Sequence, residues 1–82
     1  MGLMANDIKH RVKLLMSAVF EFPVGLIDNE SSSDNIESWD SLKHINLVSA
    51  LEEEFNVQFL DKEIMKLSTF FKIISILNKK LY

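Results

Sequence analysis

Apolar residues recur every three to four positions along most of this chain, the spacing that places them on one face of an α-helix. In residues 6–20 they stand at Ile8, Val12, Leu15 and Val19. In residues 41–55 they advance mostly in steps of three, and the expected buried stripe is Leu42, Ile45, Val48, Leu51 and Phe55. A serine or threonine at 68–69 opens a last helix, whose expected buried side is Phe70, Ile73, Ile74, Leu77 and Leu81.

A long connection, residues 21–40, separates the first two helical segments. Its polar centre, residues 29–35, is flanked by apolar side chains that we expect to pin the loop to the core: Leu26, Ile27, Ile36 and Trp39. A loop of this length in a small domain is usually functional or flexible. Residues 61–66 are long enough for one or two further helical turns.

The pattern therefore predicts an all-α fold. We expect a small four-helix bundle with three main helices, a short third helix and a long loop between helices 1 and 2. At 82 residues, the chain has room for a single domain over 1–82. The predicted core consists of Val12, Leu15, Leu42, Val48, Leu51, Phe55, Ile73 and Leu77.

Composition excludes several classes of function. Cysteine is absent, which rules out disulfides, thiolate nucleophiles and Cys-based metal sites. No apolar run approaches the roughly 20 residues of a membrane span, so we expect a cytoplasmic protein. We also expect the chain to be a monomer. The net charge is −3, and residues 21–40 carry six acids and no base, whereas both ends of the chain are basic. An acidic centre disfavours nucleic acid and favours basic protein surfaces as partners.

Histidine chemistry is weakly supported. His10 and His44 lie on different predicted helices, with no spacing that suggests a metal site. Asp40, Ser41 and His44 superficially suggest a hydrolytic triad, but all three cluster at an exposed helix start without a substrate cleft. The residues therefore favour two solvated or half-buried histidines and no enzyme activity.

Ser41 is the strongest candidate for chemistry. It follows a capping residue, Asp40, at the end of the long loop, and as the first residue of the helix it should expose its hydroxyl. A phosphodiester at this position would meet free backbone N–H groups and the positive end of the helix. Leu42, next to it, is expected to anchor the turn in the core. An ordinary helix-start serine remains the alternative interpretation.

A resemblance to a known family extends over almost the whole chain. Asp40-Ser41-Leu42, together with the run Leu51-Glu52-Glu53-Glu54-Phe55 that begins ten residues after Ser41, resembles the acyl carrier proteins. The predicted order of helices and loop is similar to that of the family as well. The resemblance implies that Ser41 accepts phosphopantetheine from coenzyme A, with Asp40 and Leu42 completing the attachment motif.

The same resemblance implies a carrier and no enzyme. A phosphopantetheinyl transferase would attach the arm, and its terminal thiol would carry acyl groups as thioesters to enzymes of fatty acid or polyketide synthesis. Those acyl-loading, acyl-modifying and acyl-transfer enzymes would dock on the second helix and the loop before it. The helices could also open a groove for an acyl chain, with Val48, Leu51, Ile64 and Ile74 as candidate lining residues or as plain core.

Five residues are the candidate partner contacts on this surface: Glu37, Lys43, His44, Glu52 and Glu53. Typical fatty-acid carriers are more acidic than this chain and often carry acids just after the motif, where Lys43 and His44 stand here. That departure favours a specialised, non-housekeeping pathway. An unmodified helical interaction domain, which would undergo no covalent change, is the alternative of a different class.

Overall fold

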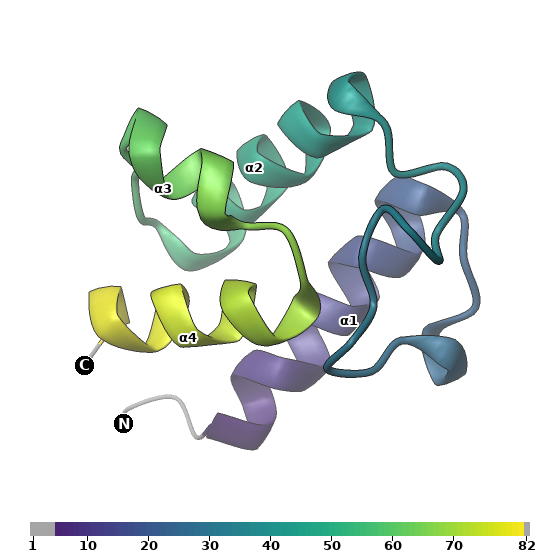
Figure 1. The fold of residues 1–82 in the computed structure, drawn as a ribbon. Helices are drawn as coiled ribbons and strands as arrows, with labels where there is room; N and C mark the ends of the chain where they lie inside the picture. The colour runs from purple at the N-terminus through teal and green to yellow at the C-terminus, as the bar shows by residue number, and fades with distance from the viewer. Residues whose placement is uncertain (1–4, 82) are drawn as a thin grey trace.

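The computed structural model describes residues 5–81, and over this range it is a bundle of four α-helices (Figure 1). They are α1 (Ala5–Phe20), α2 (Ser41–Phe55), α3 (Asp61–Lys66) and α4 (Phe70–Leu81). A short 3-10 turn, η1 (Val24–Leu26), interrupts the long loop between α1 and α2. The predicted all-α fold and order of helices are confirmed. Residues 56–60, between α2 and α3, are not helical.

Helix ends follow from local chemistry. Glu21 and Asn56 adopt the left-handed conformation directly after α1 and α2, with φ of 52° and 53°. This geometry terminates a helix by turning the next N–H groups back onto its last carbonyls. At the start of α4, the hydroxyl of Thr69 accepts the backbone N–H of Lys72 at 3.1 Å. The threonine expected to open the last helix therefore caps it.

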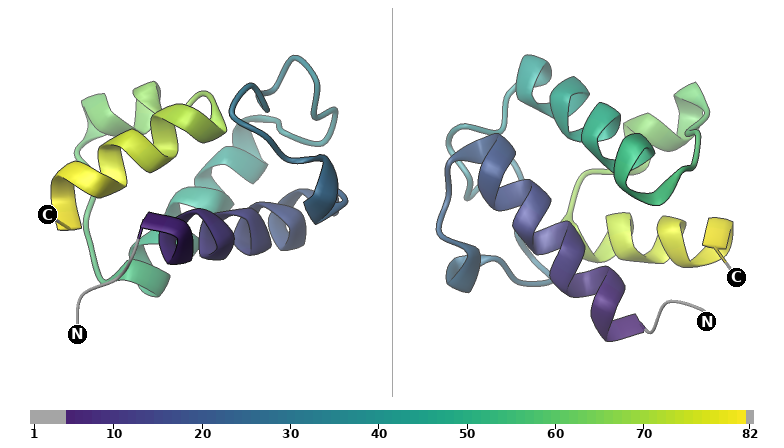
Figure 2. Two further views of the ribbon diagram at one scale, coloured as in Figure 1. Left: turned by 90° about the horizontal axis from the view of Figure 1, so that it is seen from below. Right: turned by 180° about the vertical axis from the view of Figure 1, so that it is seen from behind.

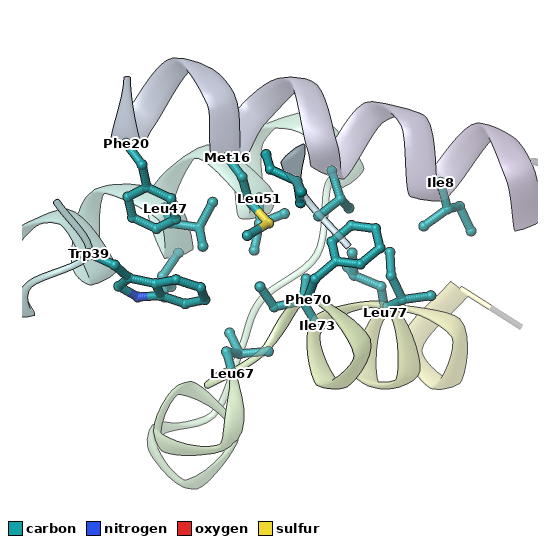
Figure 3. Close-up of a cluster of buried hydrophobic side chains, with 14 of the residues drawn as sticks. Ile8, Met16, Phe20, Trp39, Leu47, Leu51, Leu67, Phe70, Ile73 and Leu77 are labelled. Atoms are coloured by element: carbon teal, nitrogen blue, oxygen red, sulfur yellow. The ribbon is translucent and has the colours of Figure 1, made fainter. Parts of the chain in front are cut away.

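The three long helices enclose one apolar core. α1 packs most closely against α2 and also against α4, while α3 lies against α4 (Figure 2). In the close-up, Trp39 and Phe20 lie at one end of the core, and Ile8 and Leu77 lie at the other (Figure 3). The side chains of Val12, Val48, Leu51, Phe55, Ile73 and Leu77 are buried as predicted, and Leu15 is half-buried.

The prediction that Leu42 belongs to the core is wrong, because its side chain is 69% exposed. Ile45, placed on the same stripe, is 53% exposed. The reason is geometric: at 3.6 residues per turn, each step of three residues falls about 60° short of a full circle. Three such steps rotate Leu42 to about 180° from Leu51. Steps of three and four, through Leu47, Val48, Leu51 and Phe55, keep the buried face aligned.

The long loop is tied down at several points. Ile27, Ile36 and Trp39 are buried as expected, whereas Leu26 is 65% exposed. The carbonyl of Ser31 accepts the N–H of Phe70 at 3.0 Å, which joins the polar part of the loop to the start of α4. Near its end, the Ser38 hydroxyl donates to the Phe20 carbonyl at 2.5 Å. These bonds fix the direction from which the chain enters α2.

Candidate functional site

Ser41 is the first residue of α2, and its side chain is exposed. The residue before it, Asp40, has extended backbone angles and caps the helix: one carboxylate oxygen accepts the N–H of Lys43 at 2.8 Å. The N–H groups of the first helical turn have no carbonyl partner within the helix. Asp40 takes the N–H of Lys43, and the N–H groups of Ser41 and Leu42 precede this capped position in the first turn.

Leu42 does not anchor this turn, because its side chain points to solvent. The inner side of the first turn of α2 is formed by His44 instead. His44 lies seven residues before Leu51, close to two full turns, and is therefore nearly in phase with the buried face. Its imidazole is half-buried, whereas His10 on α1 is exposed, so both histidines lie in the environments expected for them.

Both ring nitrogens of His44 are engaged. The indole N–H of Trp39 donates to Nδ1 at 3.0 Å, and Nε2 lies 2.9 Å from the carbonyl oxygen of Ile64 in α3. Because an indole N–H can only donate, Nδ1 is the acceptor, and the proton on Nε2 is then donated to Ile64. In this arrangement His44 has no nitrogen left to activate Ser41. The geometry thus agrees with rejecting a hydrolytic triad.

Trp39 connects the site to the core. Its indole is 6% exposed and stacks on Phe20 with ring centroids 4.7 Å apart. The imidazole of His44 lies at the N–H edge of the indole and is nearly parallel to it, with a centroid distance of 6.0 Å. The residue before Asp40 is therefore fixed by α1 and α2 together. This packing supports the loop end from which Ser41 projects.

An open pocket of about 540 Å³ lies beside the serine. Seven residues from the loop, the start of α2 and the segment before α4 line it: Ser33, Trp39, Asp40, Ser41, His44, Ile45 and Ser68. The lining thus includes three serine hydroxyls and the apolar side chains of Trp39 and Ile45. The pocket therefore offers both polar and apolar contacts next to Ser41.

The predicted partner residues do not share one environment. Glu37 and Glu53 are exposed, and Lys43 and His44 are half-buried next to Ser41. Glu52 is half-buried too, and its carboxylate accepts the N–H of Phe59 at 2.9 Å, which holds the segment between α2 and α3. Glu52 thus has a structural contact within the chain.

The candidate groove residues lie inside the bundle. Val48, Leu51 and Ile74 are buried, and Ile64 is half-buried against the core. None of these four lines the pocket beside Ser41. Within residues 5–81, no cluster of three or more His, Asp or Glu side chains could hold a metal ion. Over the same range, none of the helices is long and apolar enough to cross a membrane.

Sequence reasoning missed the connection from Trp39 through His44 to Ile64. A signal was present, because a histidine in phase with Leu51 must face inward and a buried imidazole needs partners. Which groups would meet it depends on where α3 lies, and periodicity carries no information on that placement.

Curated proteins similar to this chain include acyl carrier proteins of Buchnera aphidicola. The one from subsp. Schizaphis graminum (strain Sg) is 33% identical over 75 residues, covering 92% of this chain and 95% of the relative. Two from subsp. Acyrthosiphon pisum, strains Tuc7 and APS, are each 32% identical over 75 residues, covering 94% of their own length. No protein-family model matches the chain. Such identity over nearly the whole length shows that the chain belongs to the acyl carrier protein family.

Proposed function

We propose that this chain carries acyl groups on a phosphopantetheine arm attached to Ser41, and that residues 1–82 act as one carrier domain. The observation that carries the proposal is the position of Ser41. In a chain of this family, it is an exposed serine at the first position of α2, directly after the capping residue Asp40. The chain would act as a carrier in the cytoplasm, without enzyme activity of its own.

The residues around Ser41 fit this group. The N–H groups of the first helical turn and the positive end of α2 favour a phosphodiester on the serine oxygen. The pocket beside it, with Trp39 and Ile45 next to Ser33 and Ser68, offers apolar and hydroxyl surfaces to the arm. When bound, the arm would supply a thiol that holds acyl groups as thioesters.

The transferase must supply the base for attachment. Asp40 and His44 are the side chains close to Ser41 in sequence that could take its proton, and both ring nitrogens of His44 are occupied by Trp39 and Ile64. Asp40 accepts the N–H of Lys43. The side chains of this protein therefore position and expose the hydroxyl, and its deprotonation is left to the partner enzyme.

Partner enzymes would dock on α2 and the end of the loop before it. Exposed acids, Glu37 and Glu53, and exposed apolar side chains, Leu42 and Ile45, share this region with Lys43. Such a surface combines apolar contact area with charges that select among basic partners. The positive charge of Lys43 beside Ser41 supports partners other than standard fatty-acid synthase enzymes, hence a specialised pathway.

Intact mass spectrometry tests the attachment site. Apo protein is incubated with a broad-specificity phosphopantetheinyl transferase and coenzyme A. Wild type should gain the mass of one arm, and Ser41→Ala should gain none. Ser49→Ala, an exposed serine on the same helix that follows no aspartate, is the matched control and should be modified like wild type. Failure of folded wild type to gain mass would leave the unmodified interaction domain as the better account.

A further inference from the structure

We propose that Trp39 and His44 close the route from Ser41 into the interior between α2 and α3, so that this carrier holds its acyl group outside the core. The inference rests on the proposed function, because it concerns cargo attached at Ser41. It names a substrate class: acyl groups short or polar enough to remain at the surface pocket. We call the hydrogen-bonded chain Trp39–His44–Ile64 the latch.

The latch spans the gap that an acyl chain would have to enter. His44 belongs to the first turn of α2, and Ile64 belongs to α3, so the bond of 2.9 Å from the imidazole to the Ile64 carbonyl joins the two helices close to Ser41. Trp39 and His44 also form part of the wall of the surface pocket. The pocket therefore ends where the latch begins.

Opening the latch is energetically unfavourable. The indole of Trp39 is almost fully buried, and its N–H would lose its acceptor if His44 moved away. A buried donor without an acceptor carries the full cost of its desolvation. The stack of Trp39 on Phe20 would be disturbed in the same movement. An acyl chain gains by burying its methylenes, but here it must first displace this arrangement.

Behind the latch, the interior between α2 and α3 offers no free apolar surface to an acyl chain. Three of the four candidate groove residues, Val48, Leu51 and Ile74, are buried against the rest of the core. The space between α2 and α3 is therefore occupied by side chains and by the latch. A long acyl chain would have to break hydrogen bonds and repack the core together, which the closely packed interior resists.

The test measures how well the protein shields thioesters of increasing length. Holo-protein is loaded with butyryl, hexanoyl, octanoyl or decanoyl groups, loading is verified by intact mass, and hydroxylamine then cleaves the thioester. Its nitrogen bonds to the acyl carbon while the carbon–sulfur bond breaks and the thiol leaves. Wild type should lose all four groups at rates that agree within about twofold, since none of their methylenes is buried.

His44→Ala removes the bond to α3 and should introduce a dependence on length. Burying one methylene shifts the equilibrium between an exposed and a buried acyl chain by up to about fourfold. Because a buried thioester is shielded, decanoyl should be cleaved at least about fourfold more slowly than butyryl in this variant. His10→Ala, an exposed histidine on α1, should behave like wild type. Length-dependent shielding in wild type, or a variant as insensitive to length as wild type, would overturn the proposal.

A second measurement needs neither cargo nor variant. In the apo protein, the ring nitrogen NMR signals of His44 should show a neutral imidazole with its proton on Nε2, and that proton should exchange slowly with water. A proton on Nδ1 would contradict the latch. If His44→Ala fails to fold, this result and the wild-type length series still decide the question. If wild type gains no arm at all, it is the proposed function that fails, which keeps the two failures distinguishable.

Discussion

At the scale of single residues, neighbouring side chains at the start of α2 point in different directions. Asp40 turns back to cap the helix, Ser41 and Leu42 face solvent, and His44 faces the core. Leu42, the leucine of the proposed attachment motif, is thus a surface residue that adds apolar area beside the serine. Its contribution should be to recognition by other proteins, with little effect on the stability of this one.

One substitution made at two positions of α2 tests this assignment. Leu51→Ala empties a fully buried site and should lower the free energy of unfolding by about 2–5 kcal/mol. Leu42→Ala removes a side chain that is 69% exposed and should cost less than about 0.5 kcal/mol. Urea denaturation of both variants and wild type provides the comparison. Similar losses of unfolding free energy for the two variants would show that Leu42 belongs to the core.

The exposure of Ser41 needed only local information, because an aspartate directly before an amphipathic stretch is a preferred helix cap and the residue after it begins the helix. The cap itself was predicted and is confirmed by the bond from Lys43 to Asp40. The error at Leu42 came from following the stripe in steps of three, which drift around the helix. His44 could not be assigned its partners, because Trp39 and Ile64 reach it only in the folded chain.

At the scale of helices, α3 depends on its neighbours. Six residues are too few for an isolated helix to be stable in water. Glu63 stabilises α3 through two contacts. Its carboxylate accepts the N–H of Leu60 at 2.8 Å and pairs with Lys80 of α4 at 2.8 Å. The imidazole of His44 holds the other side. The position of α3, and with it the latch, is therefore set by side chains from two other helices.

Glu63 should make this arrangement sensitive to acid. Its bond to the N–H of Leu60, and secondarily Lys80, lower the pKa of its carboxyl below the ordinary value of 4.5. When the folded pKa is the lower one, the unfolded chain binds more protons, so stability rises with pH. The contribution of Glu63 is complete above pH 4.5 and is lost as the pH falls through the folded value.

Unfolding free energies of wild type and Glu63→Gln, measured from neutral pH downward, isolate this effect from the other acids. The difference between the two proteins should be constant above pH 4.5 and shrink below it. Lys80→Gln removes the ion pair but leaves the bond to Leu60, so it should preserve most of the pH dependence. A difference that stays constant in acid would show that Glu63 titrates alike in both states.

The helices themselves were largely predictable. The ranges 41–55 and 61–66 are confirmed, and the first and last helices begin within two residues of where the pattern placed them. Periodicity suffices for this because each helix buries one continuous face. It could not show that the loop is fixed by the bond from the N–H of Phe70 to the Ser31 carbonyl and by the bond from the Ser38 hydroxyl to the Phe20 carbonyl, since such contacts join distant parts of the sequence.

At the scale of the whole molecule, the distribution of charge bears on the choice of partner. The net charge is only −3, and the acids fall mainly in the centre of the sequence. On the proposed docking surface, Glu37 and Glu53 are exposed, but Lys43 stands two positions after Ser41. An enzyme that reaches the base of the arm must therefore meet a positive charge. Basic patches shaped for acidic carriers should associate with this surface slowly.

Lys43→Glu tests whether that charge selects partners. Unlike His44, Lys43 takes no part in the latch, so its charge can be reversed without opening the structure. The acylated holo-variant should be turned over about threefold faster than wild type by standard fatty-acid synthase enzymes at low salt, chiefly through faster association. The advantage should fade as added salt shortens the screening length. Lys9→Glu, an equal change of charge on the exposed side of α1, should have little effect. If wild type already serves those enzymes as well as Lys43→Glu does, the charge beside Ser41 does not discriminate, and a housekeeping role in fatty acid synthesis becomes the better proposal.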